Sequence, residues 1–484
     1  MSILGHLKPE VVWNIFEEIC QVPRPSKKED KIIEYLLNWA EKHNIEAKRD
    51  EIGNILMRKP ATKGKEQVKS IIMQSHMDMV CEKNNDVDFN FETDAIVPRI
   101  DGEWVYATGT TLGADDGIGM ASQMAVLISE DIAHGPIEAL FTVDEETGLT
   151  GAFALQPNFF ESKTLINLDS EDEGELFIGC AGGMDTTATF DYEKEVVPAG
   201  YKAFKLEVKG LNGGHSGDEI DKGYGNANKI LTRVLWNSDK YDLKIADIVG
   251  GNLRNAIPRE ANAVVVVRED SVAEFKTFFQ EFAKDVRAEL KTTEKNLELV
   301  ISETETPEFV IDENTQYNLV NSMYACPHGV IAMSRDMENM VETSTNLASI
   351  KMHKNKNEIF VTTSQRSSVE SSIHDIASMV ESVFILAGAK VEHGDGYPGW
   401  TPNTDSEIMK VSSNSYEKLF GKKPVVRSIH AGLECGLFLE KYPDLDMISF
   451  GPTLRSVHSP DERINIETVE KFWKHLIDVL ETIK

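Results

Sequence analysis

The order of hydrophobic and polar positions up to about residue 180 is that of strands alternating with helices. Apolar residues at helical spacing follow a capping box, Ser26-Lys27-Lys28-Glu29, and predict a helix over about residues 27–42. A second helix is predicted over residues 117–128. Short apolar runs that predict buried strands lie at residues 70–74, 137–142 and 164–168. This alternation predicts an α/β domain with a mostly parallel central sheet flanked by helices.

The pattern changes after Gly182-Gly183 and returns near residue 399. In between, strand-like runs are mixed with two long amphipathic helices, predicted at about residues 272–292 and 368–387. Beyond residue 399 the α/β rhythm resumes. We therefore predict a discontinuous domain, residues 1–184 and 399–484, around an inserted α+β domain at residues 185–398.

Composition and charge exclude several classes of protein. At 484 residues the chain is long enough for roughly two or three structural units. Its net charge of −30 opposes binding to nucleic acid or to an anionic membrane surface. No apolar run reaches the ~18 residues of a membrane helix, and the N-terminus lacks the pattern of a secretory signal. We expect a cytoplasmic protein with reduced thiols, whose partners are small molecules or metal cations.

Potential metal ligands follow the three predicted strands of the first domain. His76 and Asp78 point to the same face of a strand, so one can bind a metal while the other orients it. Asp144-Glu145-Glu146 and Asp169 follow the next two strands, and ligands of open α/β sheets bind beyond such strand ends. Carboxylates crowded in one crevice are costly unless cations or protons neutralise them.

Two further segments extend this set. Asp115 lies in the glycine-rich turn Leu112–Gly119 ahead of a helix, where it serves either a site or the helix N-terminus. His458 lies in the loop after the strand that ends near Phe450. These nitrogen and oxygen donors suit zinc, with manganese or cobalt as alternatives. Three ligating carboxylates and a bridging hydroxide balance the charge of two divalent cations, which favours a two-metal site.

Five motifs, in chain order, carry a resemblance to a known family: SHMDMV, LGADDGIG, DEETG, INLDSED and VHSPDER. They closely resemble those of the di-zinc metallopeptidases of the aminoacylase and carnosinase superfamily. The segments GLNGGHSGDEI, GNLRNAIPREANAVV, TSQRSS and IHAGLECGLF resemble its aminoacyl-histidine dipeptidase branch. The resemblance spans essentially the whole chain. It implies a split catalytic domain, an inserted lid that also forms a homodimer, and hydrolysis of unblocked dipeptides, especially Xaa-His, including β-alanyl-histidine.

The resemblance also implies a ligand set for two zinc ions per chain. Asp115 is the bridging carboxylate. His76 and Asp169 would complete the coordination of one ion, and Glu146 and His458 that of the other.

Three residues carry the implied catalytic roles. Glu145 would be the general base that activates a water between the two metals. Asp78 would orient His76. In the inserted domain, His215 would stabilise the tetrahedral oxyanion, commonly from the lid of a dimer mate.

Three further residues are candidates for substrate binding. Arg366 offers a fork to the substrate's C-terminal carboxylate, with a surface arginine as the alternative. Asn255 is a polar candidate beside the same pocket. Glu434 could hold the substrate's amine, or could be a charged position in the first turn of a helix.

Two other functions stay open. An aminoacylase, a tripeptidase or another amidohydrolase would share these motifs and differ only in its substrate pocket. A non-catalytic metal-dependent binding protein is the alternative outside the enzymes. Glu145 argues against it, because a binding protein needs no general base.

Overall fold

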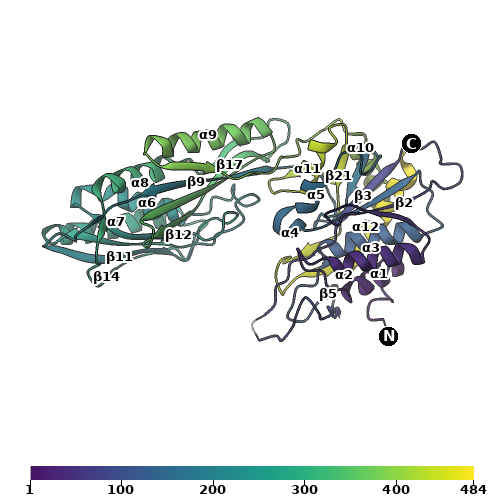
Figure 1. The fold of residues 1–484 in the computed structure, drawn as a ribbon, viewed down its shortest axis with the longest axis horizontal. Coiled ribbons are helices and arrows are strands. Elements are labelled where there is room, and N and C mark those ends of the chain that lie inside the picture. Colours follow the sequence, from purple (N-terminus) through teal and green to yellow (C-terminus); the bar gives the residue numbers. More distant parts are fainter. Residues whose placement is uncertain (1, 85) are drawn as a thin grey trace. The chain divides into compact units, whose positions relative to one another are not determined.

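The computed structural model describes residues 2–84 and 86–484 and divides the chain into two compact units (Figure 1). Unit 1 runs to Cys180 and also contains Trp400–Ser428 and Leu433–Lys484. Unit 2 consists of Ala181–Gly399 and Ile429–Gly432. The predicted fold class, a discontinuous α/β domain with an α+β insertion, is confirmed.

Unit 1 contains an eight-stranded sheet in the order β1-β2-β6-β3-β7-β21-β8-β20. The four central strands β6, β3, β7 and β21 are parallel, whereas β1 pairs antiparallel with β2, β2 with β6, and β8 with β21. All residues of β3 and β6 are buried, as expected for strands covered on both faces. The bounds are β1 Glu46–Arg49, β2 Ile55–Lys59, β3 Ile71–His76, β6 Ile137–Thr142, β7 Thr164–Asn167, β8 Glu175–Cys180, β20 Val425–Ile429 and β21 Asp446–Ser449.

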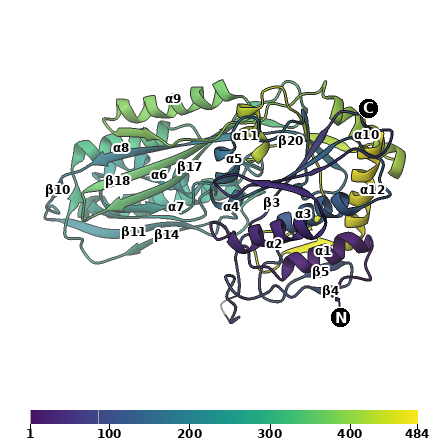
Figure 2. The ribbon, with the colours of Figure 1, turned by 45° about the vertical axis from the view of Figure 1, so that its right-hand side comes forward.

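Helices of unit 1 cover this sheet with their apolar faces. Figure 2 shows α1, α2 and α3 on the same side of β3, and α10 packs against α12. One large buried cluster joins residues of these helices to the sheet. The bounds are α1 Glu10–Cys20, α2 Asp30–Lys42, α3 Ala114–Ile128, α4 Glu145–Gly148, α5 Thr150–Ala154, α10 Glu407–Phe420, α11 Glu434–Lys441 and α12 Ile466–Thr482.

A small four-stranded sheet in unit 1 carries two of the loops that matter for the site. Its order is β22-β23-β5-β4, and β22 and β23 form a hairpin whose loop contains His458. The bounds are β4 Arg99–Asp101, β5 Trp104–Tyr106, β22 Leu454–Arg455 and β23 Arg463–Asn465. β23 pairs with β5, so the loop of His458 leaves the sheet beside the chain that leads from β5 to α3.

The predicted capping box at the start of α2 is wrong. The helix begins at Asp30, and Lys27 has a left-handed backbone with φ 65°. Ser26 Oγ instead donates to Asp78 Oδ2 at 2.8 Å, and Glu29 accepts from the backbone amides of Lys27 and Asp144. The two polar side chains of the motif are therefore directed at the candidate site rather than at the helix.

Unit 2 is a nine-stranded sheet in the order β14-β11-β13-β12-β17-β18-β9-β19, with β16 paired to β17. Its described strand pairs are antiparallel, and four helices pack on the sheet around one buried cluster. The strands are β9 Gly182–Asp191, β11 Tyr201–Lys209, β12 Lys244–Gly250, β13 Ala261–Arg268, β14 Glu298–Glu303, β16 Gly329–Met333, β17 Val341–His353, β18 Glu358–Ser367 and β19 Lys390–His393, with a separate pair β10 Lys194–Glu195 and β15 Val310–Ile311. The helices are α6 Ala227–Asn237, α7 Val272–Glu289, α8 Glu313–Ala325 and α9 Glu370–Leu386, with short 3₁₀ turns η1 Asp239–Tyr241 and η2 Glu269–Ser271.

Two general features of the chain complete the description. All five cysteines carry free thiols. Over residues 2–84 and 86–484, the structure contains no helix with the length and apolar character that crossing a membrane requires.

Candidate active site

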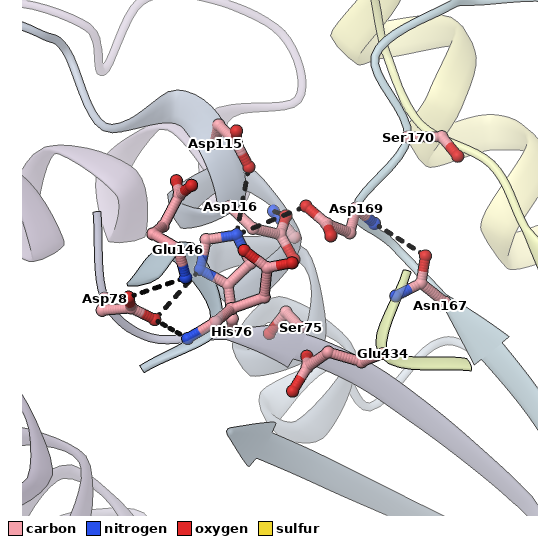
Figure 3. Close-up of polar contacts among 12 residues, drawn as sticks. Ser75, His76, Asp78, Asp115, Asp116, Glu146, Asn167, Asp169, Ser170 and Glu434 are labelled. Atoms are coloured by element: carbon pink, nitrogen blue, oxygen red, sulfur yellow. Dashed lines mark hydrogen bonds and ion pairs between the residues drawn. The ribbon is translucent and has the colours of Figure 1, made fainter. Parts of the chain in front are cut away.

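The central parallel strands bring the predicted ligands to one edge of the unit 1 sheet. β3 ends at His76 and lies between β6 and β7, which lead into Glu146 and Asp169. Asp115 comes from the first turn of α3. Figure 3 shows these side chains turned toward one another although they lie far apart in the sequence.

The two carboxylate oxygens of Asp115 face different histidines. Asp115 Oδ1 lies 3.1 Å from His76 Nε2, and Asp115 Oδ2 lies 3.3 Å from His458 Nε2. His76 Nε2 is also 3.4 Å from Asp169 Oδ1, and His458 Nε2 is 3.0 Å from Glu146 Oε2. The five side chains therefore form two nitrogen and oxygen clusters that share one carboxylate. This donor set fits a pair of divalent cations.

Electrostatics in the cluster also favour cations. Burial raises the pKa of Asp169 and of Glu145 well above the usual value, despite the opposing effect of His76, and nearby carboxylates add to the rise. Burial also disfavours ionised Asp115, but hydrogen bonds from both histidines outweigh it and hold the pKa of Asp115 below its usual value. Burial lowers the pKa of His458, yet hydrogen bonds to Asp115 and to the Glu146 carboxylate raise it to about 11. Without metal, the raised pKa values keep protons on Asp169, Glu145 and His458. Two divalent cations would balance the negative charge of these carboxylates in place of the protons.

The Asp78 carboxylate contacts both His76 and the loop of the candidate base, Glu145. Its Oδ1 lies 3.3 Å from His76 Nδ1, the ring nitrogen directed away from the other ligands. The backbone amides of Glu145 and Glu146 donate to the same carboxylate, at 3.0 and 3.3 Å. One buried side chain therefore sets the position of three residues of the cluster.

Glu434 lies in the first turn of α11, as one of the two interpretations of the sequence expected, but it is not at the surface. It is fully buried at the start of α11 and accepts hydrogen bonds from Gln74 Nε2 at 2.6 Å and Thr142 Oγ1 at 2.7 Å. Burial raises its pKa to about 7. Its second oxygen, Oε1, has no hydrogen-bond partner among the residues described.

Sequence reasoning missed a further acidic residue of the centre, Asp116. It is buried, and ligand atoms of Asp116, His76 and Asp169 lie within 4.8 Å of one another. Its position directly after Asp115 in the glycine-rich turn was the available signal.

The remaining candidates lie in unit 2, so the structure does not place them in the cluster of ligands. His215 and Asn255 lie on two neighbouring loops, joined by a hydrogen bond from the amide of Ser216 to the carbonyl of Asn255 at 2.9 Å. His215 is half-buried, whereas Asn255 is exposed.

Arg366 is buried in a row of three residues across the unit 2 sheet. It pairs with Ser344 of β17 on one side and with Gly183 of β9 on the other. Its Nη1 donates to the hydroxyl of Tyr397 at 3.0 Å, while Nε has no hydrogen-bond partner among the described residues. A Cβ at Gly183 would come within 2.8 Å of the Tyr397 ring, so glycine makes room for this tyrosine. The arginine is thus a buried positioned donor rather than a surface side chain.

His430 is a second residue that sequence reasoning missed. Its Nε2 lies 2.7 Å from Ser344 Oγ, and Ser344 is the cross-strand partner of Arg366. Burial, with Arg366 and His215 nearby, lowers the pKa of His430 to about 3, so the ring is neutral at physiological pH. His430 directly follows β20, and a polar residue at a strand end was the same signal that identified Asp169.

The structure thus combines a split α/β unit, whose strand ends gather histidines and carboxylates suited to metal ions, with an inserted α+β unit. The chain belongs to the peptidase family M20/M25/M40, whose model matches residues 72–482. The family resemblance seen in the sequence motifs is therefore confirmed.

Individual relatives agree with this assignment. The chain is 46% identical over 484 residues to the cytosol non-specific dipeptidase of Escherichia coli (strain K12), an alignment that covers 100% of this chain and 99% of the relative. The crystal structure of the aminoacylhistidine dipeptidase from Vibrio alginolyticus matches with a TM-score of 0.90 and 44% identity, over 99% of this chain and 98% of that one. Aminopeptidase PepT from Bacillus cereus shares the fold, with a TM-score of 0.58 and 19% identity over 98% of each chain.

Proposed function

We propose that the protein is a cytoplasmic, metal-dependent dipeptidase that hydrolyses the peptide bond of unblocked dipeptides, Xaa-His dipeptides among them. The observation that carries this function is Asp115, whose two oxygens face two histidines beside the paired glutamates 145 and 146. Support comes from the two relatives of 46% and 44% identity, both named as dipeptidases and both aligned over nearly their full length.

The metal centre in this proposal holds two zinc ions. His76 and Asp169 would hold one ion, Glu146 and His458 would hold the other, and Asp115 would contribute to both sites. Bound there, two such ions would supply Lewis acidity for the scissile carbonyl and for the attacking water. Asp78 fixes the ring of His76 through Nδ1, which leaves Nε2 directed at the metal side.

Glu145 is the general base of the proposed reaction. Its neighbour Glu146 would hold a metal, and hydrogen bonds from both backbone amides to Asp78 fix the turn that carries the two side chains. Glu145 accepts the proton of the attacking water and returns it to the leaving amine. Glu434, buried beside the centre, accepts a hydrogen bond from the substrate's free amine.

Unit 2 supplies the other substrate contacts. The substrate's C-terminal carboxylate binds Arg366, whose buried Nε is unpaired among the described residues. His430 beside Arg366 is neutral, so the positive charge that attracts the substrate's carboxylate is that of the guanidinium. His215 stabilises the oxyanion, and Asn255 is a further polar contact. In this proposal residues 185–398 form a lid that also makes a homodimer, and residues 1–184 and 399–484 form the catalytic domain.

The proposal is tested by a substrate panel together with metal analysis. Free amino acid release should be fast from Xaa-His and other unblocked dipeptides and slow from N-acetyl amino acids and tripeptides. Elemental analysis should find two zinc ions per chain. Preferred cleavage of N-acetyl amino acids or of tripeptides would instead assign an aminoacylase or a tripeptidase. Metal binding without hydrolysis of any substrate class would assign a binding protein.

A further inference from the structure

One buried carboxylate in unit 1 is bound to an unusual number of backbone amides. Glu462, 2% exposed, accepts hydrogen bonds from four consecutive N–H groups. Oε2 receives those of Leu112 at 2.7 Å and Gly113 at 2.9 Å, and Oε1 receives those of Ala114 at 2.7 Å and Asp115 at 3.3 Å. Four converging amides form a concave anion site, which here is filled by a side chain of the same protein.

The small sheet explains how Glu462 reaches this loop. Glu462 ends the hairpin loop between β22 and β23, four residues after His458. β23 pairs with β5, and the chain that leaves β5 runs through residues 107–113 to the start of α3. The two loops therefore leave adjacent strands, although 347 to 350 residues separate the paired groups in the sequence.

A buried arginine holds the same loop from its other side. Arg24 Nη2 donates to the carbonyl of Gly113, and Nη1 donates to the carbonyl of Asp78 at 2.7 Å. Gly113 has φ 70°, and a Cβ at this position would lie 2.6 Å from Arg24 Nη2. The loop before Asp115 is therefore fixed through its amides by Glu462 and through a carbonyl by Arg24.

We propose that Glu462 is a positioning residue for the metal centre: it ties the loop of Asp115 to the loop of His458 and so sets the spacing between these two ligands. The inference rests on the proposed two-metal centre. His458 is the most exposed of the five ligands, with 51% of its side chain accessible, and it comes from a loop rather than from the sheet. The ion held by Glu146 and His458 consequently depends most on this connection.

The first experiment compares the variants Glu462→Gln and Glu138→Gln. A glutamine at 462 has one oxygen for four amides, and its own N–H groups would face two of them. Glu138 is a matched control, because it is 5% exposed, lies in unit 1 and accepts the backbone amides of Glu161 and Ser162 at the opposite end of β6 from the ligands. Titration with Zn²⁺, and with Co²⁺ followed by its visible absorption, measures the affinity for each ion.

We expect Glu462→Gln to keep the first ion and to bind the second about 10–100-fold more weakly. Glu138→Gln should bind both ions as the parent does. Parental affinity for both ions in a folded Glu462→Gln variant would overturn the proposal. If the parent protein takes up no metal, the proposed function itself is contradicted. This outcome differs from parental affinity in Glu462→Gln, which contradicts only the role of Glu462.

A second experiment, hydrogen–deuterium exchange, uses metal-free protein and so does not require the variants to bind metal. In the metal-free parent protein, the amides of residues 112–115 should exchange slowly with deuterium, because Glu462 already holds them. Glu462→Gln should speed their exchange, and Glu138→Gln should not. If these amides exchange rapidly in the metal-free parent and become protected only when metal is added, the metal rather than Glu462 organises the loop and the proposal fails.

Discussion

Asp115 connects the two halves of the proposed centre, since each of its oxygens faces a different histidine. Asp115→Ala should therefore lose both metal ions, whereas loss of a ligand on one side should leave one ion bound. Elemental analysis after gel filtration measures this. Asp101→Ala, an exposed aspartate on β4, is the control and should keep two ions. Two zinc ions per chain in Asp115→Ala would rule out the bridging role.

A variant of Glu145 tests the proton-transfer step of the proposed reaction rather than the binding of metal. Glu145→Gln keeps the size of the side chain but removes the group that accepts the water's proton. We expect kcat to fall by about 10²–10⁴-fold or more with the metal content unchanged. Steady-state kinetics on a dipeptide, with metal analysis on the same sample, give both quantities. Near-parental turnover would show that Glu145 is not the base.

Arg366 tests how the substrate's carboxylate is recognised. The guanidinium can donate two charge-assisted hydrogen bonds to a carboxylate, which a carboxamide cannot replace. Dipeptide amides should therefore have a much lower kcat/KM than the matching dipeptides, and Arg366→Ala should remove most of that difference. Equal kcat/KM for acid and amide in the parent protein would contradict the role.

At the scale of elements, the packing of α12 against α10 predicts a contribution of His475 to unfolding in acid. His475 of α12 is 3% exposed, and its Nε2 lies 2.9 Å from the carbonyl oxygen of Ser412 on α10. Burial lowers the pKa of His475 to about 4, despite the opposing charges of Asp478 and Glu173. In the unfolded chain the pKa of His475 is near 6.5, so between about pH 6.5 and pH 4 the unfolded chain binds more protons than the folded protein. Folding stability therefore falls as the pH drops through this range.

The variant His475→Gln should remove this contribution. Between pH 7.5 and pH 5 the free energy of unfolding decreases in both proteins. We expect this decrease to be about 2 kcal/mol smaller in the variant than in the parent. Denaturant unfolding at several pH values measures the difference, and the other ionisable groups cancel because both proteins contain them. Parallel pH profiles would show that protonation of His475 does not contribute to acid unfolding.

At the scale of the whole molecule, assembly and catalysis are connected in the proposed mechanism. His215 belongs to unit 2 and the metal ligands to unit 1, so the histidine can act on the reacting carbonyl only when a lid meets a catalytic domain, of its own chain or of a partner. Among the residues that the structure describes, the antiparallel sheet of unit 2 ends at the edge strands β14 and β19, and edge strands pair readily in symmetric dimers.

Complementation between two inactive variants tests this connection. His215→Ala should lose about 10²–10³-fold in kcat with both metals retained. Mixing it with Glu145→Gln should restore part of the activity, because a mixed dimer contains one site with an intact base and an intact histidine from the other chain. Differently tagged chains verify that subunits exchange. Exchange without recovery would place His215 in the site of its own chain or outside the mechanism.

The sequence by itself determined the fold class and the positions of the strong ligand candidates. Buried strands and amphipathic helices have local periodicities, so the alternation of β3, β6 and β7 with helices could be read directly from the chain. Parallel neighbours end at the same edge of a sheet, and this rule alone brought His76, Glu146 and Asp169 to one place.

Only the tertiary structure decided how these ligands are held. The local pattern of residues 26–29 predicted a helix cap, but Ser26 and Glu29 bind groups near the site. Nothing local distinguished Glu462, because its partners lie on a segment distant in the sequence. His430 did follow a strand end, but its partner Ser344 was equally distant. Periodicity is a property of neighbouring residues, whereas a buried hydrogen bond can join any two segments that the fold brings together. The clustering of the candidate ligands, and Asp78 beside His76, could therefore be predicted from the chain, whereas the contacts of Glu462 could not.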